Sequence, residues 1–184
     1  MKNALMVCLL SAVCMTLSFA ADMPGSVIGN TLDRQVTMIE KELVPLADAM
    51  PADKFDFAPT NGAFSGVRTF QQQVEHVAAV IYAVSAAVME QPNPSEMGKG
   101  ENGPASLKTK DDTVKYLKDA FAYAHKAMGT ITDRNATESI KPPYGTRPAP
   151  RFSIATEVVW HSFDHYGQMV VYARMNGIVP PASR

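Results

Sequence analysis

Residues 153–177 read SIATEVVWHSFDHYGQMVVYARMNG, and their apolar positions recur at the period of one amphipathic helix. Ser153 is a favourable N-cap, and Gly177 follows Asn176 where a helix commonly ends. At about 100° per residue, one side of this helix carries Ile154, Val158, His161, His165, Met169 and Tyr172. Two histidines therefore fall within an otherwise apolar stripe, where a ring without a polar partner is costly.

Three earlier segments have the same helical period and lie between loops rich in proline and glycine. We expect these helices at residues 26–49 (or from 30), 67–90 and 110–128. The connection at residues 131–151 is long and holds four prolines: Pro142, Pro143, Pro148 and Pro150. No segment alternates with period two, so the sequence predicts an all-α four-helix bundle with one long late connection and no sheet.

The first residues have the layout of a secretory signal peptide. Lys2 gives a short positive start, residues 4–19 are almost all apolar, and Ser18 and Ala20 suit a cleavage site. An uncleaved membrane anchor is the alternative, but the run is short for a span and Asp22 follows it. We expect residues 1–21 to be removed and the domain to occupy residues 22–184, in the periplasm or secreted.

Composition excludes several classes of protein. Both cysteines, Cys8 and Cys14, lie in the predicted signal, so the mature chain has neither a disulfide nor a catalytic thiol. Removing the signal takes away Lys2 and no acid, which leaves 16 basic residues against 18 acidic ones. That balance predicts no nucleic-acid partner. No later apolar run is long enough to span a membrane, so no membrane association is expected after cleavage.

The histidines are the residues most suited to chemistry. His161 and His165 are four residues apart, so both rings leave one helix face and can share a metal ion. Such a pair alone is more often incidental. His76, on the helix expected at 67–90, falls at the edge of an apolar stripe, where it completes a three-His site or is a satisfied interior histidine. Three imidazoles with open positions are typical of a reactive metal site. We expect His125 to be solvated, or to contact a ligand rather than the metal.

Other sites are absent from the sequence. The Glu-x-x-His pairs of di-iron bundles, the H-E-x-x-H of zinc proteases and the C-x-x-C-H of covalent haem do not occur in the mature chain. Glu157 lies one turn before His161, and Gln168 lies angularly near both ligands. Either could orient a ligand or handle a proton. The alternatives are a solvated acid for Glu157 and an interhelical hydrogen bond for Gln168, and no catalytic base is identified.

Four sequence features together resemble one family. They are His76 in mid-helix, HSFDHYGQ at residues 161–168, YARMNGIVPP at 172–181 and MPADKFDFAPT at 50–60. Across residues 26–184 the chain resembles the DinB-like superfamily, also called the damage-inducible or YfiT-like group. The resemblance implies an up-down-down-up four-helix bundle with a His-His-His site for nickel, zinc or another divalent ion. It also allows a homodimer.

The resemblance implies a choice of functions rather than one. The family includes transferases that conjugate low-molecular-weight thiols such as bacillithiol or mycothiol, and thiol-dependent isomerases. This chain departs from it at Tyr166, where arginine often stands, and in its signal peptide, which separates it from cytoplasmic thiols. We therefore expect an exported metal-dependent transferase or hydrolase acting on a small molecule or thiol. The alternatives are a non-catalytic periplasmic metal- or ligand-binding bundle, and a structural bundle with a relic site.

Overall fold

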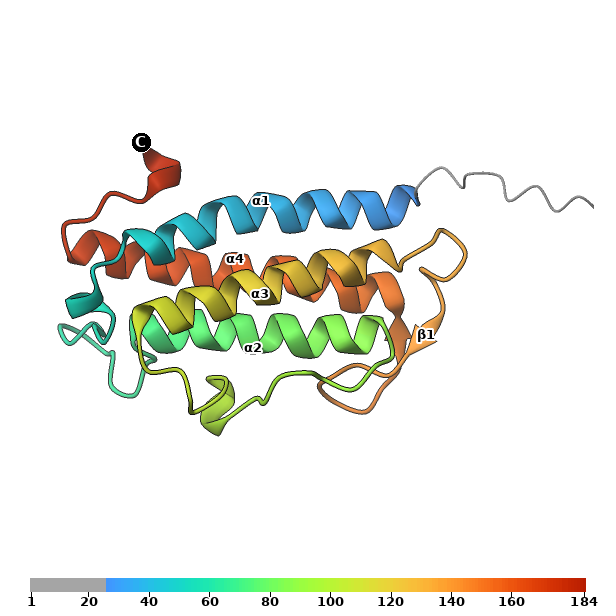
Figure 1. Cartoon of the computed structure of the whole chain (residues 1–184), viewed down its shortest axis with the longest axis horizontal. Coiled ribbons are helices and arrows are strands. Elements are labelled where there is room, and N and C mark those ends of the chain that lie inside the picture. Colours follow the sequence, from blue (N-terminus) through green and yellow to red (C-terminus); the bar gives the residue numbers. More distant parts are fainter. Residues whose placement is uncertain (1–25) are drawn as a thin grey trace, which may run out of the picture.

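The computed structural model describes residues 26–184 and contains four long helices (Figure 1). They are α1 (Val27–Ala49), α2 (Phe70–Val88), α3 (Lys110–Gly129) and α4 (Arg151–Met175). The predicted all-α four-helix bundle is confirmed. The predicted signal peptide at residues 1–21 lies outside the described residues. Within the described part, no helix combines the length and the apolar character needed to cross a bilayer.

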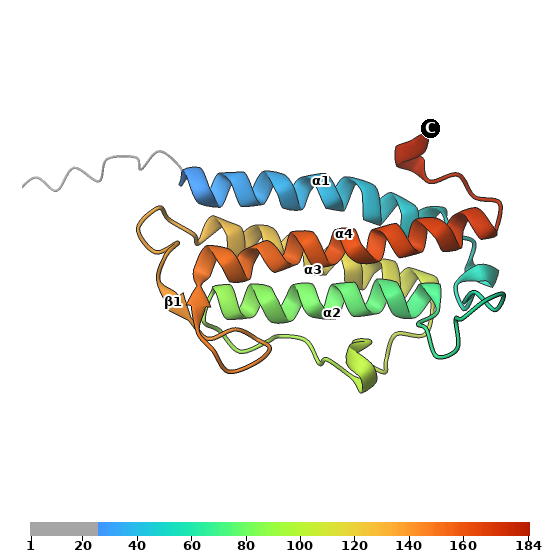
Figure 2. The same cartoon turned by 180° about the vertical axis from the view of Figure 1, so that it is seen from behind.

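The helices run up, down, down and up, as Figures 1 and 2 show from two sides. Because α2 and α3 point the same way, the connection at residues 89–109 has to return along the length of the bundle. This connection holds a short 3-10 turn, η2 (Lys99–Glu101). The long connection predicted at residues 131–151 is residues 130–150 in the structure and joins α3 to α4. The connections at residues 50–69 and 89–109 are about as long, so the bundle has three long connections rather than one. The connection at residues 89–109 runs along the bundle (Figure 1) and contributes to the site described below.

The sequence predicts no sheet, and this is wrong because the structure has one small two-stranded sheet. β1 (Ser139–Ile140) pairs antiparallel with β2 (Ala149–Pro150), and two-residue strands are too short to show a period. The ladder also corrects the start of α4, which begins at Arg151 with Pro150 as its N-cap rather than at Ser153. Its first free N–H groups donate to the carbonyls of Glu138 and Ala136. Backbone acceptors thus replace the side-chain cap.

The core lies along the apolar positions that recur at helical spacing in each of the four helices. In α1 these are Leu32, Val36, Ile39, Leu43 and Leu46, all buried, and α2 is buried on nearly every side because it packs against both α3 and α4. A capping box between Thr69 and Gln72 begins α2 three residues later than the predicted Val67. The N–H groups of Phe70 and Gln71 donate to the carbonyls of Phe57 and Phe55 in the preceding loop. These bonds fix the first turns of α2, which carry Gln73 and His76.

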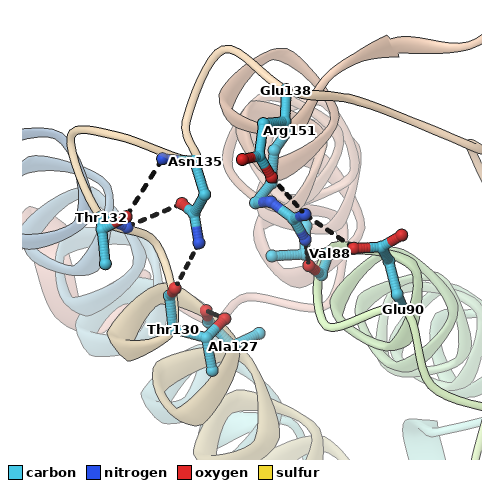
Figure 3. Close-up of polar contacts among 8 residues, drawn as sticks. All are labelled: Val88, Glu90, Ala127, Thr130, Thr132, Asn135, Glu138 and Arg151. Carbon is cyan, nitrogen blue, oxygen red and sulfur yellow. Dashed lines mark hydrogen bonds and ion pairs between the residues drawn. The ribbon is translucent and has the colours of Figure 1, made fainter.

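A buried arginine joins the end of α2 to the start of α4. Arg151 is 6% exposed, and its guanidinium donates to the carbonyl of Val88 and to the carboxylates of Glu90, at 2.7 Å, and Glu138, at 3.5 Å (Figure 3). Figure 3 also shows Asn135, whose amide closes the turn after α3 by donating to the carbonyl of Thr130 at 3.0 Å. The Arg151 contacts tie the start of α4 to the end of α2.

Candidate metal centre

The structure brings together the three histidines that the sequence singled out. His76 comes from α2, and His161 and His165 come from α4. One nitrogen of each ring lies within 4.8 Å of the other two, and the ring centroids are 4.5 to 5.0 Å apart. His76 and His165 are buried and His161 is half-buried. This group could hold one metal ion, and the role of each ring as a ligand stays a prediction.

The carbonyl of Glu101 fixes the tautomer of His76. The His76 Nδ1 atom lies 3.0 Å from this oxygen, which can only accept, so Nδ1 carries the proton. The Nε2 atom of His76 is then unprotonated, and its lone pair is available to bind a metal or accept a hydrogen bond. Glu101 sits in the connection at residues 89–109 with φ at 59°, a left-handed conformation that is uncommon outside glycine. The connection at residues 89–109 thus supplies a backbone atom that orients the ring of His76.

A chain of amides fixes the tautomer of His165. Asp164 accepts from the Gln168 amide at 3.0 Å, Gln168 Oε1 accepts from the Gln73 amide at 3.0 Å, and Gln73 Oε1 lies 2.5 Å from His165 Nδ1. A carboxylate only accepts, so each amide donates toward Asp164 and accepts from the other side. His165 must therefore donate from Nδ1, which leaves its Nε2 unprotonated.

Neither neutral tautomer of His161 gives every ring nitrogen of the group a hydrogen-bond partner. Its Nε2 atom lies 3.2 Å from the Nε2 atom of His76, and its buried Nδ1 atom has no hydrogen-bond partner in the described residues. A proton on His161 Nε2 would satisfy His76 but leave His161 Nδ1 and His165 Nε2 unpaired. A cation shared by the three rings would accept one lone pair from each and leave only the His161 Nδ1 proton without a partner in the described residues. Three imidazoles are a donor set that zinc and nickel favour. The residues present therefore fit a divalent metal.

The electrostatics of the group keep the rings neutral. Burial lowers the pKa of His161 to about 3 and of His165 to about 4, and it also lowers the pKa of His76. Charge on the neighbouring imidazoles and on Arg68 acts in the same direction. Neutral imidazole is the form that binds metal, so the rings are ready to bind near neutral pH.

Comparison with known proteins identifies the family of this chain. The DinB superfamily model matches residues 35–169, which include all three histidines. The chain belongs to the DinB superfamily. No curated protein sequence matches it.

Two solved structures share the DinB fold. A DinB-like protein from Bacillus cereus is 16% identical, with a TM-score of 0.66 over 83% of this chain and 95% of that one. A proposed member of the DinB family from Exiguobacterium sibiricum is 17% identical, with a TM-score of 0.61 over 83% and 93%. At these identities the likeness shows the fold alone.

A small cavity of about 160 Å³ opens beside the DinB histidines. Its lining includes His76, His161, Glu101, Tyr144 and Glu157. Glu157 is half-buried, and burial raises the pKa of its carboxyl group, so it is not a fully solvated acid. Burial and the nearby carboxylates raise the pKa of Tyr144, whose hydroxyl is buried without a hydrogen-bond partner in the described residues.

The two remaining candidates, Gln168 and His125, do not line the cavity beside the histidines. Gln168 makes the interhelical hydrogen bond to Gln73 that was its alternative reading, and through Gln73 it acts on His165. His125 is remote from the group. Its Nδ1 and Nε2 atoms lie 2.6 Å and 3.1 Å from carboxylate oxygens of Asp33 and Glu40 on α1, so it joins α3 to α1.

Sequence reasoning missed two groups that orient the DinB histidines. Gln73 lies one helical turn before His76, and an amide at that spacing was a detectable signal. Glu101 acts through its backbone carbonyl, for which no side-chain pattern exists.

Proposed function

We propose that this DinB superfamily protein is exported, binds one divalent transition metal (nickel or zinc) through His76, His161 and His165, and acts as a metal-dependent transferase or hydrolase on a small molecule. The observation that supports this most is the 3.2 Å approach of the His76 and His161 Nε2 atoms beside an open cavity. Three protein ligands leave coordination positions for a substrate, as catalytic sites do.

The residues around the cavity have different roles in the proposed reaction. When bound, a divalent ion would supply Lewis-acid chemistry to a substrate oxygen or thiol. The Glu101 carbonyl and the Gln73 amide hold the rings of His76 and His165 in orientation. The Glu157 carboxyl, with its raised pKa, can hold or release a proton at the cavity. The partnerless hydroxyl of Tyr144 can donate a hydrogen bond to a substrate.

The first experiment is a metal inventory. Protein without a histidine tag is purified, and its metal is measured by inductively coupled plasma mass spectrometry. We expect about one equivalent per chain, its loss in His161→Ala and no change in His125→Ala. A folded His161→Ala variant that still carries one equivalent would refute the site.

Activity separates the enzyme from the alternative, a non-catalytic metal- or ligand-binding bundle. Loaded and metal-stripped protein are assayed for addition of a thiol to an electrophile and for hydrolysis of esters and amides. Turnover that depends on the metal supports the enzyme. One equivalent of metal without any turnover supports the non-catalytic bundle.

Export and assembly need separate measurements. Intact mass of protein from the periplasmic fraction is expected to show a chain that begins near Ala21 or Asp22, and retention of Met1 there would contradict export. The molar mass from light scattering tests the proposed homodimer.

A further inference from the structure

A second, larger pocket lies next to the DinB site. Its volume is about 460 Å³, and its polar lining consists of Arg68, Gln72, Gln73, Asn102 and Gln168. Gln73 connects it to His165, and the connection at residues 89–109 contributes Asn102 here and Glu101 to the cavity beside His76. The two cavities therefore flank the same short loop and the same group of histidines.

The side-chain oxygens of this pocket are already in use. Gln73 Oε1 accepts from His165, and Gln168 Oε1 accepts from Gln73. Gln72 Oε1 accepts from the N–H of Thr69 at 3.0 Å in the capping box. Because an N–H only donates, the orientation of the Gln72 amide is fixed.

Arg68 fixes the orientation of the Asn102 amide. Its Nε atom donates to Asn102 Oδ1 at 2.9 Å, and its Nη2 atom donates to the carbonyl of Gly100 at 2.9 Å. The backbone carbonyl of Arg68 accepts from the hydroxyl of Tyr172 at 3.2 Å, which ties this residue to α4. An arginine only donates, so the oxygen of Asn102 must face it, and its amide nitrogen is left over.

The side-chain polar atoms of the pocket that make no hydrogen bond are all donors. They are the amide nitrogens of Gln72 and Asn102 and the Nη1 atom of Arg68, none of which has a hydrogen-bond partner in residues 26–184. Since each side-chain oxygen already accepts one hydrogen bond, the pocket favours a group that only accepts.

The charge of the pocket agrees with its hydrogen bonding. No carboxylate of the described chain lies within ion-pair distance of Arg68, and none lines the pocket. Asp164 accepts from Gln168, and Glu101 lines the neighbouring cavity, where its carboxylate lies 4.0 Å from His76 Nδ1. A guanidinium held by neutral oxygens, next to a site for a divalent cation, attracts an anion.

We infer that this pocket binds an oxyanionic group of the substrate, a carboxylate or a phosphate ester, so that the DinB site takes small organic anions. The inference rests on the proposed function because it assigns the substrate class of that site. Arg68 would pair with the anion through its free Nη1 atom, and the amides of Gln72 and Asn102 would donate to its remaining oxygens. The rest of the molecule would then lie toward the histidines.

The test is direct binding, which needs no turnover. Titration calorimetry measures succinate and inorganic phosphate against the protein as purified, with neutral succinamide as the uncharged control and the metal content measured on the same sample. We expect an anion to bind and succinamide not to bind. The anion that binds more tightly distinguishes a carboxylate from a phosphate.

Two variants assign the binding to this pocket. Arg68→Gln removes the charge, with Arg34→Gln as the matched control because Arg34 is an exposed arginine on α1. Gln72→Glu keeps the capping box, since glutamate serves equally at that position, but places a carboxylate in the pocket. Each pocket variant should weaken anion binding by about tenfold or more, and Arg34→Gln should not. Metal content should stay unchanged in Gln72→Glu, whereas Arg68→Gln also frees the loop that carries Glu101, so its metal content is measured alongside.

The outcomes separate this inference from the proposed function. An anion that binds equally well to wild type and to Gln72→Glu, or no anion binding at all, overturns the inference even if the protein carries metal. Anion binding lost in both pocket variants supports it even if the metal inventory fails. If Arg68→Gln misfolds, Gln72→Glu still decides the question, because it preserves the local fold.

Discussion

His76 Nε2 and His161 Nε2 lie 3.2 Å apart, although the two residues are 85 positions apart in the chain and sit on different helices. His76 already donates its Nδ1 proton to Glu101, so the contact cannot be a hydrogen bond donated by His76. The two atoms are close enough for one ion to bind both, as the proposed site requires. If it does, the groups that orient the rings should affect metal affinity as well as the ligands themselves.

Gln73→Leu tests this control. The leucine removes the one acceptor that residues 26–184 offer to the His165 Nδ1 proton, and His165 is buried. Loss of such an orienting partner lowers metal affinity by about 10- to 100-fold. Competition with a chromogenic chelator measures the effect. Gln73→Glu, which keeps an acceptor for His165 but loses the donor to Gln168, is the comparison and should lose less metal affinity than the leucine variant. Equal affinity in the leucine variant would show that the amide chain does not matter.

Acid should release the metal at a lower pH than the ordinary pKa of histidine suggests. From the sequence alone, affinity is expected to weaken as pH falls through about 6.5. Burial lowers the pKa of His161 to about 3 and of His165 to about 4, so protons compete with the metal in the folded chain only near those values. Equilibrium dialysis at about pH 5.5 should still find metal bound. Complete release there from folded protein would contradict the lowered pKa values.

The same shifts predict the acid stability of metal-stripped protein. Between the ordinary value of 6.5 and the folded values, the unfolded chain binds protons at His161 and His165 that the folded chain does not. The free energy of unfolding therefore falls as pH falls through this window. Urea unfolding of the stripped protein at several pH values measures the slope. In His161→Ala the slope should be smaller.

The sequence predicted those parts of the structure that side-chain periodicity encodes. The stripe of α1, from Leu32 to Leu46, is buried as expected, and the spacing of His161 and His165 placed both rings on one face. Features made by backbone atoms were not predictable in this way. The cap of α4 uses the carbonyls of Ala136 and Glu138, and the tautomer of His76 depends on a carbonyl in a distant loop.

His125 should give a pH dependence of opposite sign. Burial alone would lower its pKa, but hydrogen bonds to Asp33 and Glu40 outweigh burial and raise it. A raised pKa means that the protonated bridge stabilises the fold below pH 6.5 and that this contribution is lost as pH rises through the folded value. In His125→Gln this alkaline loss should disappear while metal content stays unchanged. Titration of the His125 ring by NMR gives the pKa directly, and a value below 6.5 would contradict the bridge.

Arg151→Met tests whether the join between α2 and α4 supports the site. The guanidinium is buried, whereas its partners Glu90 and Glu138 are exposed, so removing the arginine leaves two solvated carboxylates and one unpaired Val88 carbonyl (Figure 3). The cost is that of an unsatisfied buried acceptor, about 2 kcal/mol, rather than that of a stranded buried charge. Urea unfolding should show this loss, and the exposed Arg147→Met should not. Because Arg151 ties the start of α4 to the end of α2, metal affinity should also weaken in the folded variant. Loss of stability with unchanged affinity would mean that the histidines are positioned by core packing and the amide chain alone.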